Sequence, residues 1–151
     1  MIKTVEIKRF NKKAASMSRK FSSIVTDFSR LTERELTAGG IEIRNTIIEG
    51  LLNPPKTGRM YGDHQASAPG EYPATKSGDL VASIIFDVRN LELEVGSSMD
   101  GEKYPEYLEL GTPKGQMEPR PFIAPSVEKH AEEILDNIAD AFSDIIIQGM
   151  R

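Results

Sequence analysis

Residues 84–95 read IIFDVRNLELEV, and this stretch decides the fold because its apolar residues recur at every second position. The alternation runs on both sides of Arg89-Asn90, and Asn tolerates the positive φ that a tight turn needs. The stretch therefore predicts an antiparallel hairpin with Arg89-Asn90 at its turn. One face is apolar, as expected for a sheet covered on one side, and the other face carries the acids Asp87, Glu92 and Glu94.

The segments on either side of this hairpin have the period of helices. An apolar stripe recurs every three or four residues from about 12 to 52, which predicts a helical segment in one or two pieces that ends at Asn53-Pro54-Pro55. Gly39-Gly40 interrupts it and marks a kink, a break or a close packing contact. Residues 2–8 alternate weakly and predict a short strand. Pro125 opens a clearly amphipathic C-terminal helix.

These elements predict an α+β fold: a small, mainly antiparallel sheet packed against a long N-terminal helical segment and a C-terminal helix. A length of 151 residues suits one domain, spanning residues 1–151. The predicted core takes the apolar faces of all three elements: Phe28, Leu31, Ile43, Ile47, Leu51, Ile84, Phe86, Leu93, Val95, Leu108, Phe122, Ile134, Ile138 and Phe142.

A long loop, residues 54–79, separates the first helical segment from the hairpin. It holds eight Pro and Gly residues, which disfavour helices and strands of any length. Loops of this length are usually functional or disordered. Because Tyr61 and Tyr72 add aromatic surface to the loop, we expect it to be flexible in the free protein and to order on a partner.

Composition excludes many classes of enzyme. The chain has no cysteine, which removes disulfides, thiol nucleophiles and Cys-based metal sites. His64, beside Asp63, is interpreted as a surface or backbone-bonding residue and His130 as a helix histidine. There is no glycine-rich phosphate loop, no bilayer-length apolar run and no signal-like start. We therefore expect a cytoplasmic, non-enzymatic protein without cofactor, metal or membrane contact.

The charge is unevenly distributed along the chain. Residues 1–20, a basic N-terminal arm, have a net charge of +6, whereas residues 61–151 have −10. Such an arm can bind nucleic acid or an acidic face on a partner or on the next copy of the chain, or it can simply be the solvated face of a first helix. The pI near 5.3 disfavours a dedicated DNA-binding protein.

Two stretches are more distinctive than any catalytic pattern. The first, HQASAPGEYPA at residues 64–74, is followed by Ser-Gly-Asp-Leu at 77–80 and Ser-Ile at 83–84. The second, YPEYLELGT at residues 104–112, suggests a short helix or turn ending at Gly111, and the extended PRPFIAP follows at 119–125. We expect an ion pair between Glu109 and Arg120 to join the two parts of the second stretch.

In order and spacing, these stretches resemble the signature of the gp-ten-like tail-component family of Hong Kong 97-type tailed phages and prophages. That family reads A-S-x-P-G-E-x-P-A, then S/T-G-x-L-x-x-S-I, then Y-x-x-Y-[LV]-E-x-G-T, then R-P-F before a helix. The likeness covers the chain beyond the basic arm. Three positions depart from the family pattern: Pro105, Leu110 and Pro119.

The resemblance implies a virion structural protein that joins or completes the tail at the head–tail interface by forming a ring. Its partners would be other neck and tail proteins, with at most weak contact to passing DNA, and the free subunit would be monomeric or weakly associated. Two alternatives stay open: a tail terminator capping the tail tube, or a small nucleic-acid-binding regulator using the basic arm.

Candidate residues follow from the two stretches. Those expected at the assembly interface are Tyr61, His64, Ser67, Pro69, Gly70, Glu71, Tyr72 and Pro73. Those expected to shape the motifs are Gly78, Leu80, Tyr104, Tyr107, Glu109, Gly111, Thr112, Arg120, Pro121 and Phe122.

Overall fold

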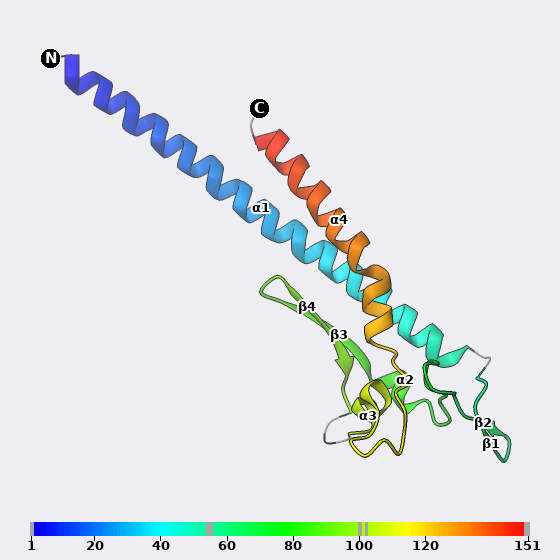
Figure 1. Cartoon of the computed structure of the whole chain (residues 1–151). Helices are drawn as coiled ribbons and strands as arrows, with labels where there is room; N and C mark the ends of the chain where they lie inside the picture. The colour runs from blue at the N-terminus through cyan, green and yellow to red at the C-terminus, as the bar shows by residue number, and fades with distance from the viewer. Residues whose placement is uncertain (1, 54–55, 100, 102, 150–151) are drawn as a thin grey trace.

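Two long helices and a hairpin dominate the molecule (Figure 1). The computed structural model describes residues 2–53, 56–99, 101 and 103–149, with residues 2–11 described by their backbone alone. The elements in chain order are α1 (Ile2–Leu52), β1 (Met60–Tyr61), β2 (His64–Gln65), α2 (Asp79–Ser83), β3 (Ile84–Arg89), β4 (Glu92–Ser97), α3 (Tyr104–Leu110) and α4 (Ala124–Gly149). The fold is α+β, as predicted.

The first helix is one uninterrupted element from Ile2 to Leu52. The predicted strand at residues 2–8 is wrong, because a strand needs a partner for its backbone hydrogen bonds whereas a helix satisfies its own. The helix also passes through Gly39-Gly40 without a break, and Ile134 and Phe86 pack directly on the two glycines, which confirms the close packing contact. The helix ends near the predicted stop, although Pro54 and Pro55 lie outside the described residues.

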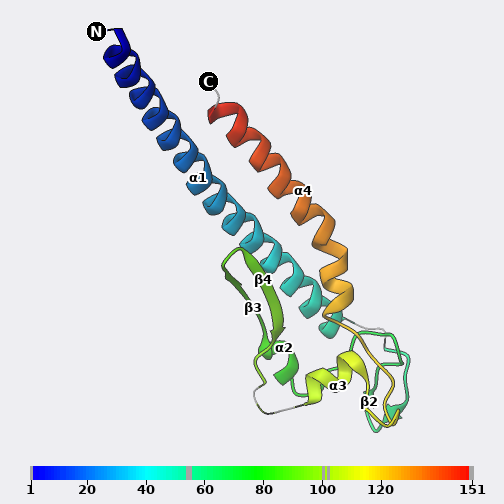
Figure 2. The ribbon, with the colours of Figure 1, turned by 60° about the vertical axis from the view of Figure 1, so that its left-hand side comes forward.

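Helix α4 runs back along α1 in an antiparallel pair (Figure 2). Where the start of α4 lies beside the end of α1, which we call the base of the molecule, the Thr46 hydroxyl and His130 Nε2 lie 2.7 Å apart. Farther along, the rings of Phe28 and Phe142 pack edge to face with centroids 4.9 Å apart. Gly149 lies against Ile24, so α1 continues past the end of α4 toward its own N-terminus (Figures 1 and 2).

The hairpin packs its apolar face on α1. Phe86 pairs with Val95 and Val88 with Leu93, which confirms the predicted faces. The turn lies one residue later than predicted, since Arg89 pairs with Glu92 and the two turn residues are Asn90 (φ 52°) and Leu91 (φ 62°). The hairpin and the short β1–β2 pair form two separate two-stranded antiparallel sheets.

The core lies at the base of the helical pair. Six predicted core residues are buried there: Ile43, Ile47, Leu51, Ile84, Leu108 and Phe122. Leu80, which was predicted as a motif residue, joins them. Phe142 is 43% exposed, so its assignment to the core is wrong. It lies where only two helices meet, and two helices cannot enclose a large ring from every side.

Candidate assembly surface

The loop predicted to be flexible is folded onto the body. Its first part, which we call the clasp (residues 56–73), is closed by the carboxylate of Glu71. That carboxylate accepts hydrogen bonds from the Thr57 hydroxyl (2.5 Å), the Thr57 N–H (3.0 Å) and the Ala68 N–H (2.8 Å). The bond from the Thr57 hydroxyl, followed by those from the two backbone N–H groups, lowers the pKa of Glu71 to about 2.

The clasp also contacts the C-terminal end of α1 directly. The ammonium group of Lys56 donates to the carbonyls of Gly50 (2.7 Å) and Tyr72 (2.9 Å), so it caps one carbonyl of the last turn of α1 and joins that turn to the clasp. Burial lowers the pKa of Lys56, while the nearby charge of Glu71 opposes that shift. The Tyr72 ring lies so close to Gly50 that a Cβ there would clash with it. The Tyr72 hydroxyl reaches Ser126 Oγ in α4 at 2.8 Å.

These contacts hold the described part of the loop, residues 56–79, against the body in this structure, while its predicted flexibility in the free protein stays a prediction. The segment has little regular structure, but its prolines and glycines do not prevent a fixed conformation. Pro73 is fully buried and Ser67 is 5% exposed. A chain can be held without helices or strands when its polar groups bond to neighbouring elements, as Glu71 and Lys56 show here.

The second motif supports the start of α4. The Glu109 carboxylate accepts the N–H groups of Phe122 (2.8 Å), Ile123 (3.0 Å) and Ala124 (2.8 Å). These N–H groups lie at a helix N-terminus, where they lack helical partners and where a negative charge is stabilising. The expected ion pair between Glu109 and Arg120 is therefore wrong, because the helix terminus occupies the carboxylate.

Arg120 instead joins the two motifs. Its Nε donates to the Ser67 carbonyl at 3.0 Å, and its Nη1 donates to the Glu118 carbonyl at 2.9 Å. Next to it, the Gly70 N–H donates to the Pro119 carbonyl at 3.0 Å. The two stretches that stand out in the sequence thus form one hydrogen-bonded unit beneath both long helices.

The remaining motif residues shape turns. Gly78 (φ 85°) precedes α2, and Gly111 (φ 79°) ends α3 with its Cα facing the Met117 carbonyl, so both positions favour glycine. The Thr112 hydroxyl accepts the Met117 N–H at 2.9 Å. The other predicted motif residues range from fully buried to partly exposed: Phe122, Leu80, Pro121, Tyr107 and Tyr104.

The predicted interface residues therefore divide into two groups. Ser67 and Pro73 are buried inside the chain and hold the clasp together, and Glu71 and Tyr72 are half-buried in the same role. The exposed members are Pro69, Gly70 and Tyr61, which is 60% exposed and carries Arg59 5.5 Å above its ring. His64 is half-buried in β2. The surface left for a neighbour at this end is the tip around Tyr61.

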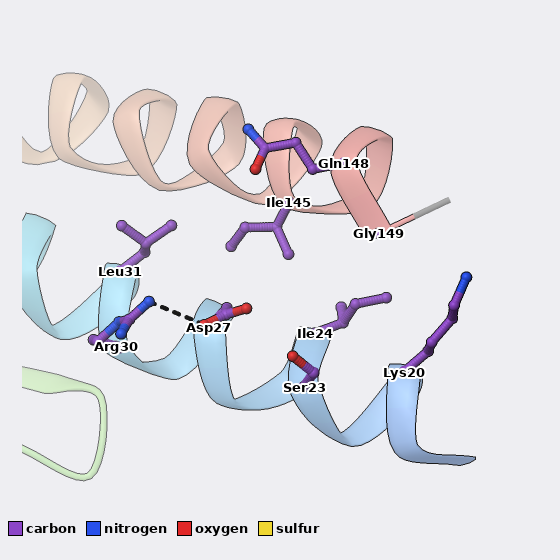
Figure 3. Close-up of a pocket in the computed structure, with 9 residues that line it drawn as sticks. All are labelled: Lys20, Ser23, Ile24, Asp27, Arg30, Leu31, Ile145, Gln148 and Gly149. Atoms are coloured by element: carbon purple, nitrogen blue, oxygen red, sulfur yellow. Dashed lines mark hydrogen bonds and ion pairs between the residues drawn. The ribbon is translucent and has the colours of Figure 1, made fainter. Parts of the chain in front are cut away.

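A second candidate surface lies at the opposite end of the molecule, where the basic N-terminal arm predicted from the sequence forms part of α1. An open groove of about 500 Å³ separates α1 from the last turn of α4. Figure 3 shows Lys20, Asp27 and Arg30 on its α1 side and Gln148 on its α4 side, with an ion pair of 3.0 Å between Arg30 and Asp27. Lys12, Lys13, Arg19 and Lys20 are all exposed near this end.

Among the side chains that the structure describes, no group of three or more His, Asp or Glu residues is placed to hold a metal ion. In the described part of the chain, no helix combines the length and apolar character needed to cross a bilayer. Comparison with protein families, curated proteins and solved structures finds no match.

Proposed function

We propose that this chain is a non-enzymatic structural protein of a tailed-phage virion, which joins or completes the tail at the head–tail interface by assembling into a ring. The observation that supports this most strongly is the union of the two family-like motifs. Through Arg120, Ser67 and the Gly70–Pro119 hydrogen bond they build one unit, so the residues that carry the resemblance lie together in the fold.

The shape and charge of the molecule also suit a ring subunit. One end carries a compact clasp with an exposed aromatic tip, and the other carries the N-terminal part of α1 with exposed cationic residues. A basic surface at one place and an acidic surface at another favour head-to-tail contacts between copies, which close into rings when the rotation allows. A ring leaves a central channel through which a DNA duplex can pass.

Deletion of the gene from a phage or prophage that carries it tests the proposal. We expect particles with filled heads and separate tails, and we expect the intact gene supplied in trans to restore joined, infectious particles. Tails of uncontrolled length would instead assign the terminator role. Normal infectious particles without the gene would refute both versions.

The exposed Lys12, Lys13, Arg19 and Lys20 keep the nucleic-acid-binding alternative open. Contact with phosphates alone weakens steeply with salt, so we expect duplex binding by the purified protein to vanish by about 200 mM salt. Tight, sequence-specific binding at that concentration would favour a regulator over a virion component.

A further inference from the structure

Helix α1 carries an exposed apolar stripe where it runs up to and past the end of α4. We call this part the α1 projection (residues 12–25). Ala14, Met17, Phe21 and Val25 recur every three or four residues and so share one face of the helix. Met17 is 64% exposed, Phe21 69% and Val25 48%. The projection contains Lys12, Lys13, Arg19 and Lys20 and no acid.

Helix α4 carries an apolar stripe beside the face that packs on α1; its Phe142 is 43% exposed although one edge contacts Phe28 of α1. We call it the α4 stripe: Leu135, Ala139, Phe142 and Ile146. These residues also recur every three or four positions, and Leu135 is 66% exposed. The exposed side of the same helix is strongly acidic, because six acids and one lysine lie between residues 128 and 144: Glu128, Glu132, Glu133, Asp136, Asp140 and Asp144, with Lys129.

The two stripes have similar lengths and residue spacing, and the charges beside them are opposite. At about 1.5 Å per residue, the α1 projection is about 20 Å long and the α4 stripe about 17 Å. Within one chain most of the projection lies beyond the end of α4, which stops beside Ile24 (Figures 1 and 2). The matching surfaces of one molecule therefore cannot cover each other, but those of two molecules can.

We propose that the α1 projection of one copy docks on the α4 stripe of the next copy. The apolar stripes face each other, while Lys13 and Lys20 lie beside Glu132 and Asp136 of the neighbour. The proposal rests on the proposed ring and names the contact that closes it. Each copy offers its projection and receives another, so the contact repeats with one sense around the ring.

The apolar stripe favours a second copy over DNA as the occupant. Phosphate contacts need only the cations, and they leave Met17 and Phe21 exposed to water. Helix α4 offers both its apolar stripe and, beside it, acids whose charge is opposite to that of the projection. Two helix segments of about 17–20 Å offer a small contact compared with the roughly 1,200 Å² at which stable interfaces begin, so we expect single contacts to be weak and the ring to depend on many of them.

Charge reversal tests this contact. One variant carries Lys13→Glu and Lys20→Glu, and the other carries Glu132→Lys and Asp136→Lys. The first variant removes the positive charge of the α1 projection, and the second removes negative charge from α4. In either variant alone the two docking surfaces therefore no longer attract each other through these charges. Self-association measured by sedimentation velocity at about 50 mM salt should weaken about tenfold or more in each. In an equimolar mixture the acidic projection meets the basic α4, so association should return.

Association in the equimolar mixture of the two variants decides whether the proposed contact exists. Restored association that then disappears at about 500 mM salt supports docking through opposite charges. Variants that associate as the unaltered protein does, or a mixture that stays as weak as its components, would overturn the proposal. Circular dichroism of each variant shows whether both helices are intact, since all four substituted residues are exposed.

Crosslinking gives a second, independent test, because the chain has no cysteine of its own. Protein with Ala14→Cys, mixed with protein carrying Ala139→Cys, should give a crosslinked heterodimer with a short bismaleimide. The matched control is Ser16→Cys, which is also exposed but lies about 160° around the helix from Ala14, on the opposite face. Equal yields from positions 14 and 16 would contradict the proposed face.

The two proposals can fail separately. Restored association in the mixture, together with normal particles from a phage that lacks the gene, would keep the contact and refute the virion role. Loss of infectivity on deletion, with full rescue by the Lys13→Glu, Lys20→Glu variant, would keep the virion role and refute the contact.

Discussion

Glu109 shows how much one side chain decides at the base of the molecule. Its carboxylate accepts three backbone N–H groups as the chain enters α4, next to the fully buried Phe122. No other acceptor is provided for these groups among the described hydrogen bonds, so the side chain sets where α4 begins. The sequence placed Glu109 in the correct motif but assigned it the wrong partner, Arg120.

Replacement of Glu109 by Ala should destabilise the protein by about 2–3 kcal/mol, because the N–H groups of the helix terminus lose a charged acceptor. Urea unfolding followed by circular dichroism measures this loss. Glu109→Gln keeps an acceptor oxygen without the charge and should lose roughly half as much. Unchanged stability of the Ala variant would show that the capping contact contributes nothing.

Glu71 makes the clasp sensitive to acid. Its hydrogen bonds lower the pKa from 4.5 to about 2, so the folded state favours the charged form. The stabilisation from this group is therefore complete above pH 4.5 and is lost as the pH falls toward 2. The unaltered protein should be more stable than Glu71→Gln at neutral pH, and the difference in urea midpoint should shrink over that window. A difference independent of pH would contradict the assignment.

At the scale of elements, the glycines of the two long helices mark the places where other elements touch them. A Cβ at Gly39 would meet Ile134 of α4, and one at Gly50 would meet Tyr72 of the clasp. A Cβ at Gly40 would lie 2.5 Å from the Phe86 ring of the hairpin. Each glycine costs helix propensity, and the close approach of a packed neighbour offsets that cost.

Gly40→Ala should therefore destabilise the protein by about 1–3 kcal/mol, although Ala is the better helix former. Thermal unfolding measures the change. The matched control is Gly96→Ala in β4, where the added Cβ has no neighbour within 4 Å and stability should stay nearly the same. A Gly40→Ala variant at least as stable as the original would show that Phe86 and Leu93 move aside at little cost.

At the scale of the whole molecule, the clasp has two parts: a root that packs on the body, which includes residues 71–73, and an exposed tip at residues 60–63. Tyr72 and Pro73 lie in the root, so a Gly/Ser bridge in place of the whole loop would remove part of the core. A replacement that leaves stability nearly unchanged must therefore be confined to the tip, where Met60 and Tyr61 are 53% and 60% exposed.

Replacement of residues 60–63 by Gly and Ser should change stability by no more than about 1 kcal/mol, because the loop length is conserved and no buried group is lost. If this tip contacts a neck or tail neighbour, the variant should fold but fail to restore tail joining in a phage lacking the gene. A thermal melt beside the complementation assay separates the two effects. A folded variant that yields infectious particles would refute a role for the tip.

Local patterns in the sequence determined most of the element types. The alternation at residues 84–95 specified the hairpin and its buried face, and the stripe after Pro125 specified α4. The positive φ of Gly78 and Gly111 fits turns that the motifs placed correctly. These features depend on neighbours within a few residues, so the chain contains the information locally. The strand predicted at residues 2–8 failed because two alternating apolar residues are too weak a local signal to outweigh an uninterrupted helix.

Contacts between distant residues were decided by the tertiary structure alone. Arg120 bonds to Ser67, 53 positions away, and Tyr72 reaches Ser126, 54 positions away. A residue's type limits which partners it can bond, but only the packing of α1, α4 and the clasp selects one. The same holds for the candidate surfaces. The stripe of the α1 projection continues the apolar stripe of the helix in the sequence, and only the structure shows that it stays exposed where α1 runs past Gly149 of α4.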